Sequence, residues 1–156
     1  MYIVLVVLQT AILPVASTVV QILLVGGDPF VVAGIWWGFW GVGTRLAVAG
    51  ISQLANPSRT AKGILGIEDA GADQVVHELG YANLSLGIVA LAAPFVPVWG
   101  ILTALPGALY LGLAGVRHIA KKNKGAEEIV ATWTDLLVFV AVGAGLVAVI
   151  GSVLAP

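Results

Sequence analysis

Residues 129–154 read IVATWTDLLVFVAVGAGLVAVIGSVL and contain one ionisable side chain, that of Asp135. A helix of about 20 apolar residues is enough to cross about 30 Å of hydrocarbon. Four more runs of this kind lie at 2–25, 30–55, 74–93 and 98–119. Backbone groups inside a bilayer must be paired within the segment, and the runs lack the alternation of barrel strands. The sequence therefore predicts an all-α bundle of five transmembrane helices.

The composition supports the same fold class. Of the 156 residues, 60% are hydrophobic and only 10% are charged, whereas soluble domains carry about 25% charged residues. The net charge of −1 gives no reason to expect a nucleic-acid partner. Without cysteine, disulfides and thiolate metal sites are excluded. Residues 1–13 contain no Lys or Arg, so we expect the first run to be a span and not a signal peptide. No linker divides residues 1–156, and a single domain is predicted.

The basic residues predict an orientation. Arg59 and Lys62 lie between the second and third runs, and four more basic residues lie from Arg117 to Lys124, around the connection between the fourth and fifth runs. With five spans, both connections fall on one side, and basic loops favour the cytoplasmic side. We therefore expect a cytoplasmic N-terminus and an outside C-terminus.

Several polar residues fall at one depth, in the cytoplasmic third of the predicted bilayer. They are Arg45, His77, Glu78, Asn83, Arg117, His118 and Asp135. Ionisable groups within a membrane need a partner or a function. For Arg45 the depth predicts Glu78 as the first choice of partner and Asp135 as the second.

A line of glycines leads to this cluster. Gly34, Gly38, Gly41 and Arg45 follow helical spacing and share one face of the second run. Small residues allow another helix to approach closely. The face therefore predicts close packing, with Arg45 pointing into the bundle.

Structural interpretations of the cluster remain open. Arg45–Glu78 and Arg117–Asp135 would then be ion pairs that fix the register of the helices. Arg117 and His118 would be anchors at the membrane edge, and His77 a polar residue at a helix start. The five tryptophans would be interface anchors or packing residues.

Functional interpretations remain open beside them. The cluster could relay protons or hold an anionic head group. His77 and His118 could bracket a haem, and with Glu78 and Asp135 they offer ligands that zinc accepts. The HExxH and GxSxG patterns are absent, so no catalytic residue is assigned and no cofactor is fixed.

Two stretches resemble a known family. HELGYANLSLG at 77–87, and LGLAGVRHI at 111–119 with the later Asp135, resemble the signature of a family of small prokaryotic integral-membrane proteins with no assigned function. The resemblance implies a helical bundle in the cytoplasmic membrane of a prokaryote, and it marks Glu78, Asn83, His118 and Asp135 as candidate functional positions. In its length and its high glycine content, the chain also loosely resembles DoxX-type membrane proteins, which have four helices.

These features favour a non-enzymatic membrane protein, either an accessory subunit or a small oligomer, whose polar cluster binds a lipid, a quinone or an ion. Its expected partners are the bilayer and either further copies of itself or a larger membrane complex. One alternative is a proton-coupled transporter or channel protomer. A second is a haem- or metal-dependent membrane redox protein.

Overall fold

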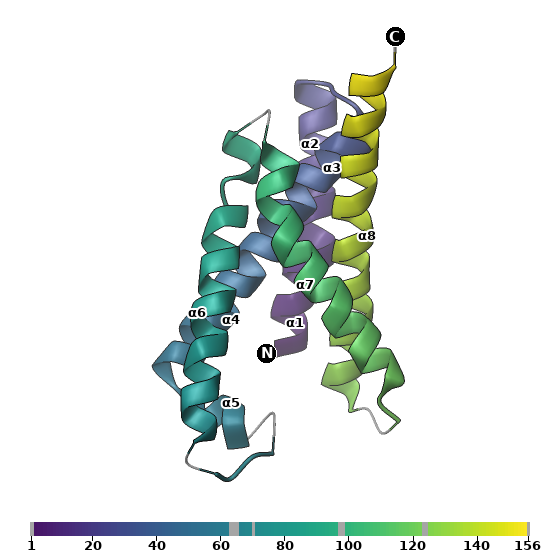
Figure 1. The fold of residues 1–156 in the computed structure, drawn as a ribbon. Helices are drawn as coiled ribbons and strands as arrows, with labels where there is room; N and C mark the ends of the chain where they lie inside the picture. The colour runs from purple at the N-terminus through teal and green to yellow at the C-terminus, as the bar shows by residue number, and fades with distance from the viewer. Residues whose placement is uncertain (1, 63–65, 70, 97–98, 123–124, 156) are drawn as a thin grey trace.

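The computed structural model describes residues 2–62, 66–69, 71–96, 99–122 and 125–155 (Figure 1). Within them lie five helical segments that are long and apolar enough to cross a membrane, which confirms the predicted number. These five spans are Ile3–Leu24, Pro29–Ala55, Ala72–Phe95, Gly100–Ala120 and Glu128–Leu154.

The first two spans are built from several helical pieces, and the last three from longer α-helices. The elements are α1 (Tyr2–Val7), the π-helix η1 (Leu8–Ile12), α2 (Leu13–Leu24), α3 (Pro29–Trp36), the π-helix η2 (Trp37–Thr44), α4 (Arg45–Ala55), α5 (Pro57–Thr60), α6 (Ala72–Ala90), the 3₁₀-helix η4 (Ala93–Phe95), α7 (Gly100–Ala120) and α8 (Ala126–Leu154). The ends lie close to the predicted ones. The largest differences are at α8, which begins at 126 instead of 129, and at α6, which ends at 90 instead of 93.

Local chemistry explains the turn between the first two spans. Gly26 and Gly27 have positive φ angles of 81° and 119°, which glycine adopts without a steric penalty. Asp28 then caps α3, because its carboxylate accepts hydrogen bonds from the backbone N–H groups of Phe30 and Val31.

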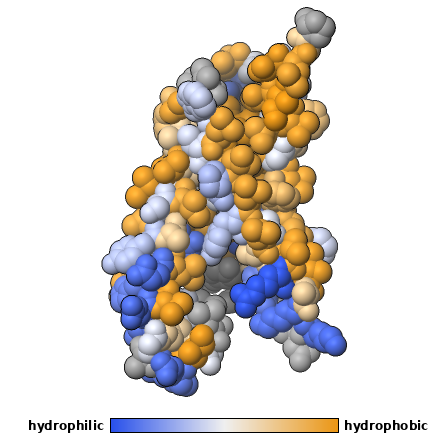
Figure 2. All heavy atoms as spheres, in the orientation of Figure 1, coloured by the Kyte–Doolittle hydropathy of each residue, from blue (hydrophilic) through white to orange (hydrophobic). Residues whose placement is uncertain are grey.

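The bundle divides into two arms toward one end. α6 packs along α4 and α5, whereas α7 packs along α8. Figure 1 shows these two pairs diverging toward the connections that carry the basic residues, and we call this the basic end. Figure 2 shows the molecule hollowed between the arms, with hydrophilic side chains on both. We call this space the inter-arm hollow.

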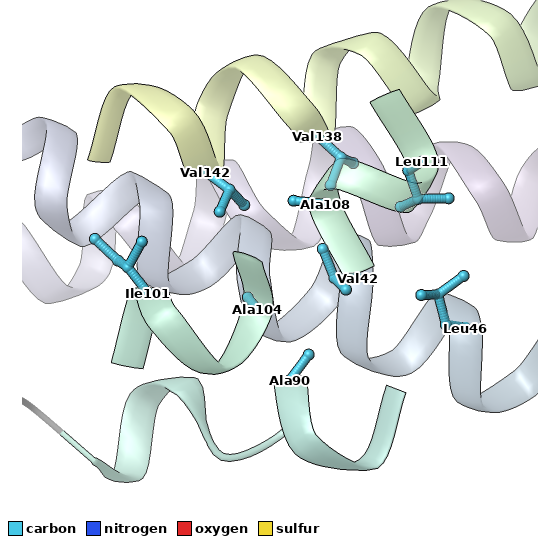
Figure 3. Packing of buried hydrophobic residues seen from close by; sticks show 9 residues of the cluster. All are labelled: Val42, Leu46, Ala90, Ile101, Ala104, Ala108, Leu111, Val138 and Val142. Carbon is cyan, nitrogen blue, oxygen red and sulfur yellow. The ribbon is translucent and has the colours of Figure 1, made fainter. Parts of the chain in front are cut away.

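The glycine face of the second span packs as predicted. A Cβ atom built on Gly34 would lie 3.0 Å from the Cα atom of Gly145 in α8. One built on Gly38 would lie 2.7 Å from the Cβ atom of Ala104 in α7. Nine buried apolar side chains form one cluster in the core (Figure 3): Val42, Leu46, Ala90, Ile101, Ala104, Ala108, Leu111, Val138 and Val142. The core is therefore built mainly from small and β-branched side chains that let the helices approach closely.

Apolar side chains cover most of the face that Figure 2 shows, along the length of the spans. Leu23 and Leu24 are 77% and 79% exposed, and Val153 and Leu154 at the end of α8 are each 75% exposed. Such an extended apolar surface is typical of contact with lipid and not with water.

Candidate functional site

The first two spans meet where both are π-helical. Pro14 follows η1 and has no backbone N–H, so it cannot donate an α-helical hydrogen bond to the carbonyl of Thr10. Trp37 replaces this donor across the helix interface, because its indole Nε1 lies 3.0 Å from the Thr10 carbonyl oxygen. A π-helical turn thus precedes Pro14, and the neighbouring helix bonds the Thr10 carbonyl that lacks its α-helical donor.

A second bond joins the two π-helices. Gln9 is buried, and its Nε2 donates to the hydroxyl of Thr44 over 3.0 Å. Thr44 in turn donates to the carbonyl of Trp40 within η2. π-helical turns inside longer helices are frequent at functional sites. Two such turns contact each other here, and the second ends directly before Arg45, so this level of the bundle is a candidate for a functional site.

Three tryptophans of the second span have a more specific role than interface anchoring. The indole groups of Trp36 and Trp40 donate to the side chains of Gln21 and Ser17, at 2.6 and 3.0 Å. Together with Trp37, they hold the first span against the second. Trp99 and Trp133 are exposed, at 59% and 68%, as the interface interpretation expects.

Arg45 pairs with Asp135. The Arg45 Nη2 atom lies 2.5 Å from Asp135 Oδ1, and the two side chains are 11% and 5% exposed. Arg45 begins α4 and Asp135 lies on α8, so the pair joins the two arms near the point where they diverge. The second-choice partner is therefore the one that the structure brings to Arg45.

Two predicted pairings are wrong. Glu78 is exposed on α6, and it does not contact Arg45. Arg117 is also exposed, and Asp135 pairs with Arg45 in its place. Depth along the membrane was the same for both carboxylates. The rotation of α6 about its own axis turns Glu78 outward, whereas α8 turns Asp135 into the bundle.

Asn83 belongs to the same region. It is 3% exposed, and its Nδ2 donates to Gln53 Oε1 on α4 over 2.8 Å. The Tyr110 hydroxyl of α7 lies near the side chains of both Asn83 and Asp135. Polar groups from α4, α6, α7 and α8 therefore converge where the arms separate. We call Arg45, Asn83, Tyr110 and Asp135 the fork site.

The fork site contains unused hydrogen-bonding capacity. In the described part of the chain, four buried side-chain atoms have no hydrogen-bond partner, namely Thr18 Oγ1, Arg45 Nη1, Asn83 Oδ1 and Asp135 Oδ1. Three of the four belong to the fork site. The ion pair joins Arg45 Nη2 to Asp135 Oδ1 and does not involve Nη1, so Nη1 is a buried donor without a partner. Each buried group left in this way costs about 1–3 kcal/mol.

His118 and Glu128 join the second arm at the basic end. His118 Nδ1 lies 3.2 Å from Glu128 Oε1, and Lys121 Nζ lies 2.9 Å from Glu128 Oε2. Thr132, one turn further along α8, is buried between this group and Asp135. His118 is also close enough to Asp135 to interact with it electrostatically. The predicted anchor His118 is therefore half-buried and paired instead of simply interfacial.

His77 and Glu78 stay apart from this group. His77 is half-buried on α6, in the other arm, and Glu78 is exposed beside it. Among the described residues, no group of three or more His, Asp or Glu side chains lies close enough to hold a metal ion. The suggested zinc site from His77, Glu78, His118 and Asp135 is thus not assembled by this fold.

Comparison with protein-family models, with curated proteins and with solved structures finds no match to this chain. The family resemblance of residues 77–87 and 111–119 therefore stays a prediction.

Sequence reasoning found Arg45, Asn83 and Asp135, but it missed Gln9, Thr44, Gln53 and Tyr110. Each of these four is a polar residue inside an apolar run, and that position was the signal in the sequence that could have identified them. Such residues are uncharged, so they are tolerated in a span for many reasons and do not stand out individually. The fork site places a guanidinium, a carboxylate, an amide and a phenol together inside an apolar bundle. This combination of groups is suited to binding a polar ligand or to transferring protons.

Proposed function

We propose that this chain is a non-enzymatic integral membrane protein that binds a small ligand at the fork site. Its N-terminus lies in the cytoplasm and its C-terminus outside, in the cytoplasmic membrane of a prokaryote. Two features support the membrane location and the orientation: the five apolar spans, and the basic residues near both connections at one end of the bundle. In a membrane it acts as a small homo-oligomer or as a subunit of a larger complex.

The observation that carries ligand binding is the Arg45 guanidinium. Its Nη2 atom contacts Asp135, whereas its Nη1 atom is a buried donor without a partner. An oxygen atom from a ligand would satisfy this donor and remove the cost of leaving it unpaired. A lipid head group, a quinone carbonyl or a small anion each supplies such an oxygen. The open Oδ1 of Asn83 can accept a hydrogen bond from the same region.

The test is to identify what stays bound during mild purification from the native membrane. An absorption spectrum and mass spectrometry of the co-purified molecules are recorded for the wild type and for the double variant Arg45→Gln/Asp135→Asn. The double variant removes both charges together, so it leaves no single charge buried. Arg59→Gln, at an exposed arginine, is the matched control.

We expect one molecule in about one copy per chain in the wild type and in Arg59→Gln, and its loss from the double variant. Retention of the same molecule by the double variant would place the ligand elsewhere. A Soret band in the spectrum would favour a haem-dependent redox protein instead.

Proton-coupled transport is a second candidate function, and the position of the Arg45–Asp135 pair favours it. The pair links the two arms, so protonation of Asp135 would neutralise the carboxylate and weaken the link. Transporters bind substrates at irregular helices of mid-membrane depth, and the contact of η1 with η2 is irregular in this sense. In liposomes with a pH-sensitive dye, Asp135→Asn should stop proton flux, whereas Glu78→Gln should leave it unchanged. Flux that survives in Asp135→Asn contradicts this role.

A further inference from the structure

A groove follows one face of α7 on the second arm. Its lining residues are Tyr110, Leu113, Ala114, Arg117 and His118, and its volume is about 250 Å³. The spacing of these positions is that of a single helical face. Tyr110, at the inner end of the groove, belongs to the fork site, while Arg117 and His118 lie in the last turn of α7 at the basic end.

The groove changes character along its length. Leu113, in the middle, is 73% exposed, and Ala114 lies beside it. Arg117 is exposed and has no ion-pair or hydrogen-bond partner among the residues that the structure describes. The groove is thus apolar toward the middle of the span and cationic toward its end.

Among the side chains that the structure describes, the positive charges around the mouth of the groove outnumber the negative ones. The described carboxylate nearby is that of Glu128, and both His118 and Lys121 bind it. Arg117 has no partner among the described residues, and Lys122, just beyond the end of α7, is also exposed. An anion at this mouth would meet an unpaired guanidinium and a carboxylate that is already neutralised.

We infer that this groove binds one anionic phospholipid, with the phosphate at Arg117 and an acyl chain along Leu113 and Ala114 toward Tyr110. A groove on a helix within the bilayer that protein does not fill is filled by lipid, since water is excluded there. Basic side chains at the cytoplasmic end of a membrane helix attract anionic head groups, and a guanidinium matches phosphate in bidentate geometry. This inference rests on the proposed membrane placement and orientation, but it requires no ligand on Arg45.

The experiment titrates the full-length protein, purified in detergent, with phosphatidylglycerol and with phosphatidylcholine of identical acyl chains. Bound lipid is counted by native mass spectrometry. We expect one phosphatidylglycerol per chain and much weaker binding of phosphatidylcholine. The affinity for phosphatidylglycerol should fall about fivefold in Arg117→Gln, since one basic side chain is lost at an anionic surface. Arg117→Lys should retain part of the affinity, because the charge remains without the bidentate geometry.

Two further variants distinguish lipid binding in this groove from non-specific attraction of anionic lipid to exposed basic residues. Arg59→Gln removes an exposed arginine from the other arm and should bind phosphatidylglycerol as the wild type does. Leu113→Trp fills the groove without changing the charge, at a position exposed enough to leave folding intact, and should lose the lipid. Equal binding of the two lipids, or equal losses in Arg59→Gln and Arg117→Gln, would overturn the inference.

The outcome is distinguishable from that of the fork-site test. The double variant Arg45→Gln/Asp135→Asn should bind phosphatidylglycerol as tightly as the wild type, because the groove mouth is untouched. If phosphatidylglycerol binding is lost in that variant and kept in Arg117→Gln, the lipid lies at the fork site and not in this groove.

Discussion

Arg45 and Asp135 are each acceptable inside an apolar bundle because the other is present. A charged side chain at membrane depth is costly, and its partner offsets that cost only while both remain. The pair therefore fixes the second span against the fifth even if no ligand binds. Its stability role and its proposed binding role can be separated by changing one residue or both.

We predict that Arg45→Leu lowers the free energy of unfolding by about 3–5 kcal/mol, because Asp135 is left buried without a counter-charge. The measurement is unfolding of the purified protein by SDS in mixed micelles, together with its melting temperature in detergent. The double variant Arg45→Leu/Asp135→Leu should recover most of the loss. Glu78→Gln, on an exposed residue, should unfold as the wild type does. An unchanged melting temperature in Arg45→Leu would rule out a structural contribution of the pair.

At the scale of elements, the first span is held by side chains of the second instead of by a continuous apolar seam. η1 and α2 receive hydrogen bonds from three indole groups of α3 and η2. The Trp37 bond is special among them, since Pro14 leaves the Thr10 carbonyl without its helical donor. The Trp37 hydrogen bond therefore links the π-helical turn of the first span to the packing of the second span against it.

Trp37→Phe should destabilise the protein by about 1–3 kcal/mol, because the ring is kept while the Thr10 carbonyl loses its donor. The same SDS titration measures this effect. Trp133→Phe provides the control at an indole that is 68% exposed, where we expect a change within about 0.5 kcal/mol. Equal effects at the two positions would show that the Trp37 hydrogen bond contributes nothing measurable.

The crossing of α4 and α6 depends on a close approach of two backbones. A Cβ atom added at Gly50 would lie 2.6 Å from the backbone nitrogen of Leu84, whereas one added at Gly143 would meet nothing within 4 Å. Gly50→Ala should therefore cost about 1–3 kcal/mol through overpacking. Gly143→Ala should be neutral or slightly stabilising, since alanine has the higher helix propensity. The two melting temperatures, compared in one detergent, test this, and a Gly50→Ala protein as stable as Gly143→Ala would contradict it.

At the scale of the whole molecule, the arrangement of the two arms determines from which side a ligand or a proton can reach the fork site. The fork site joins residues of α4 and α6 to residues of α7 and α8, and the inter-arm hollow lies between the same two arms toward the basic end (Figures 1 and 2). In the proposed orientation this opening faces the cytoplasm. A ligand or a proton would then reach Asp135 from the cytoplasmic side.

The orientation can be tested directly because the natural chain has no cysteine. Lys122→Cys and Ser152→Cys each introduce a single thiol at an exposed position near opposite ends of the bundle. With intact cells, a membrane-impermeant maleimide should label Ser152→Cys at once and Lys122→Cys only after permeabilisation. The reverse pattern would show that the basic end faces outward.

The sequence by itself determined the five spans, their approximate ends and the glycine face of the second span. These properties follow from hydropathy and helical periodicity, which are local and survive in any packing of the helices. The position of Arg45 at the end of that face was predictable for the same reason, and the structure confirms that its side chain points into the bundle.

Only the tertiary structure decided which carboxylate meets Arg45, which donor replaces the N–H missing at Pro14, and where the arms separate. Depth along a span can be counted from the sequence, but Glu78 and Asp135 have nearly the same depth. The choice between them depends on the rotation of α6 and α8, and that rotation is set by close contacts such as Gly50 with Leu84 and Gly115 with Leu136. Those contacts join segments far apart in the chain, so no local pattern encodes them.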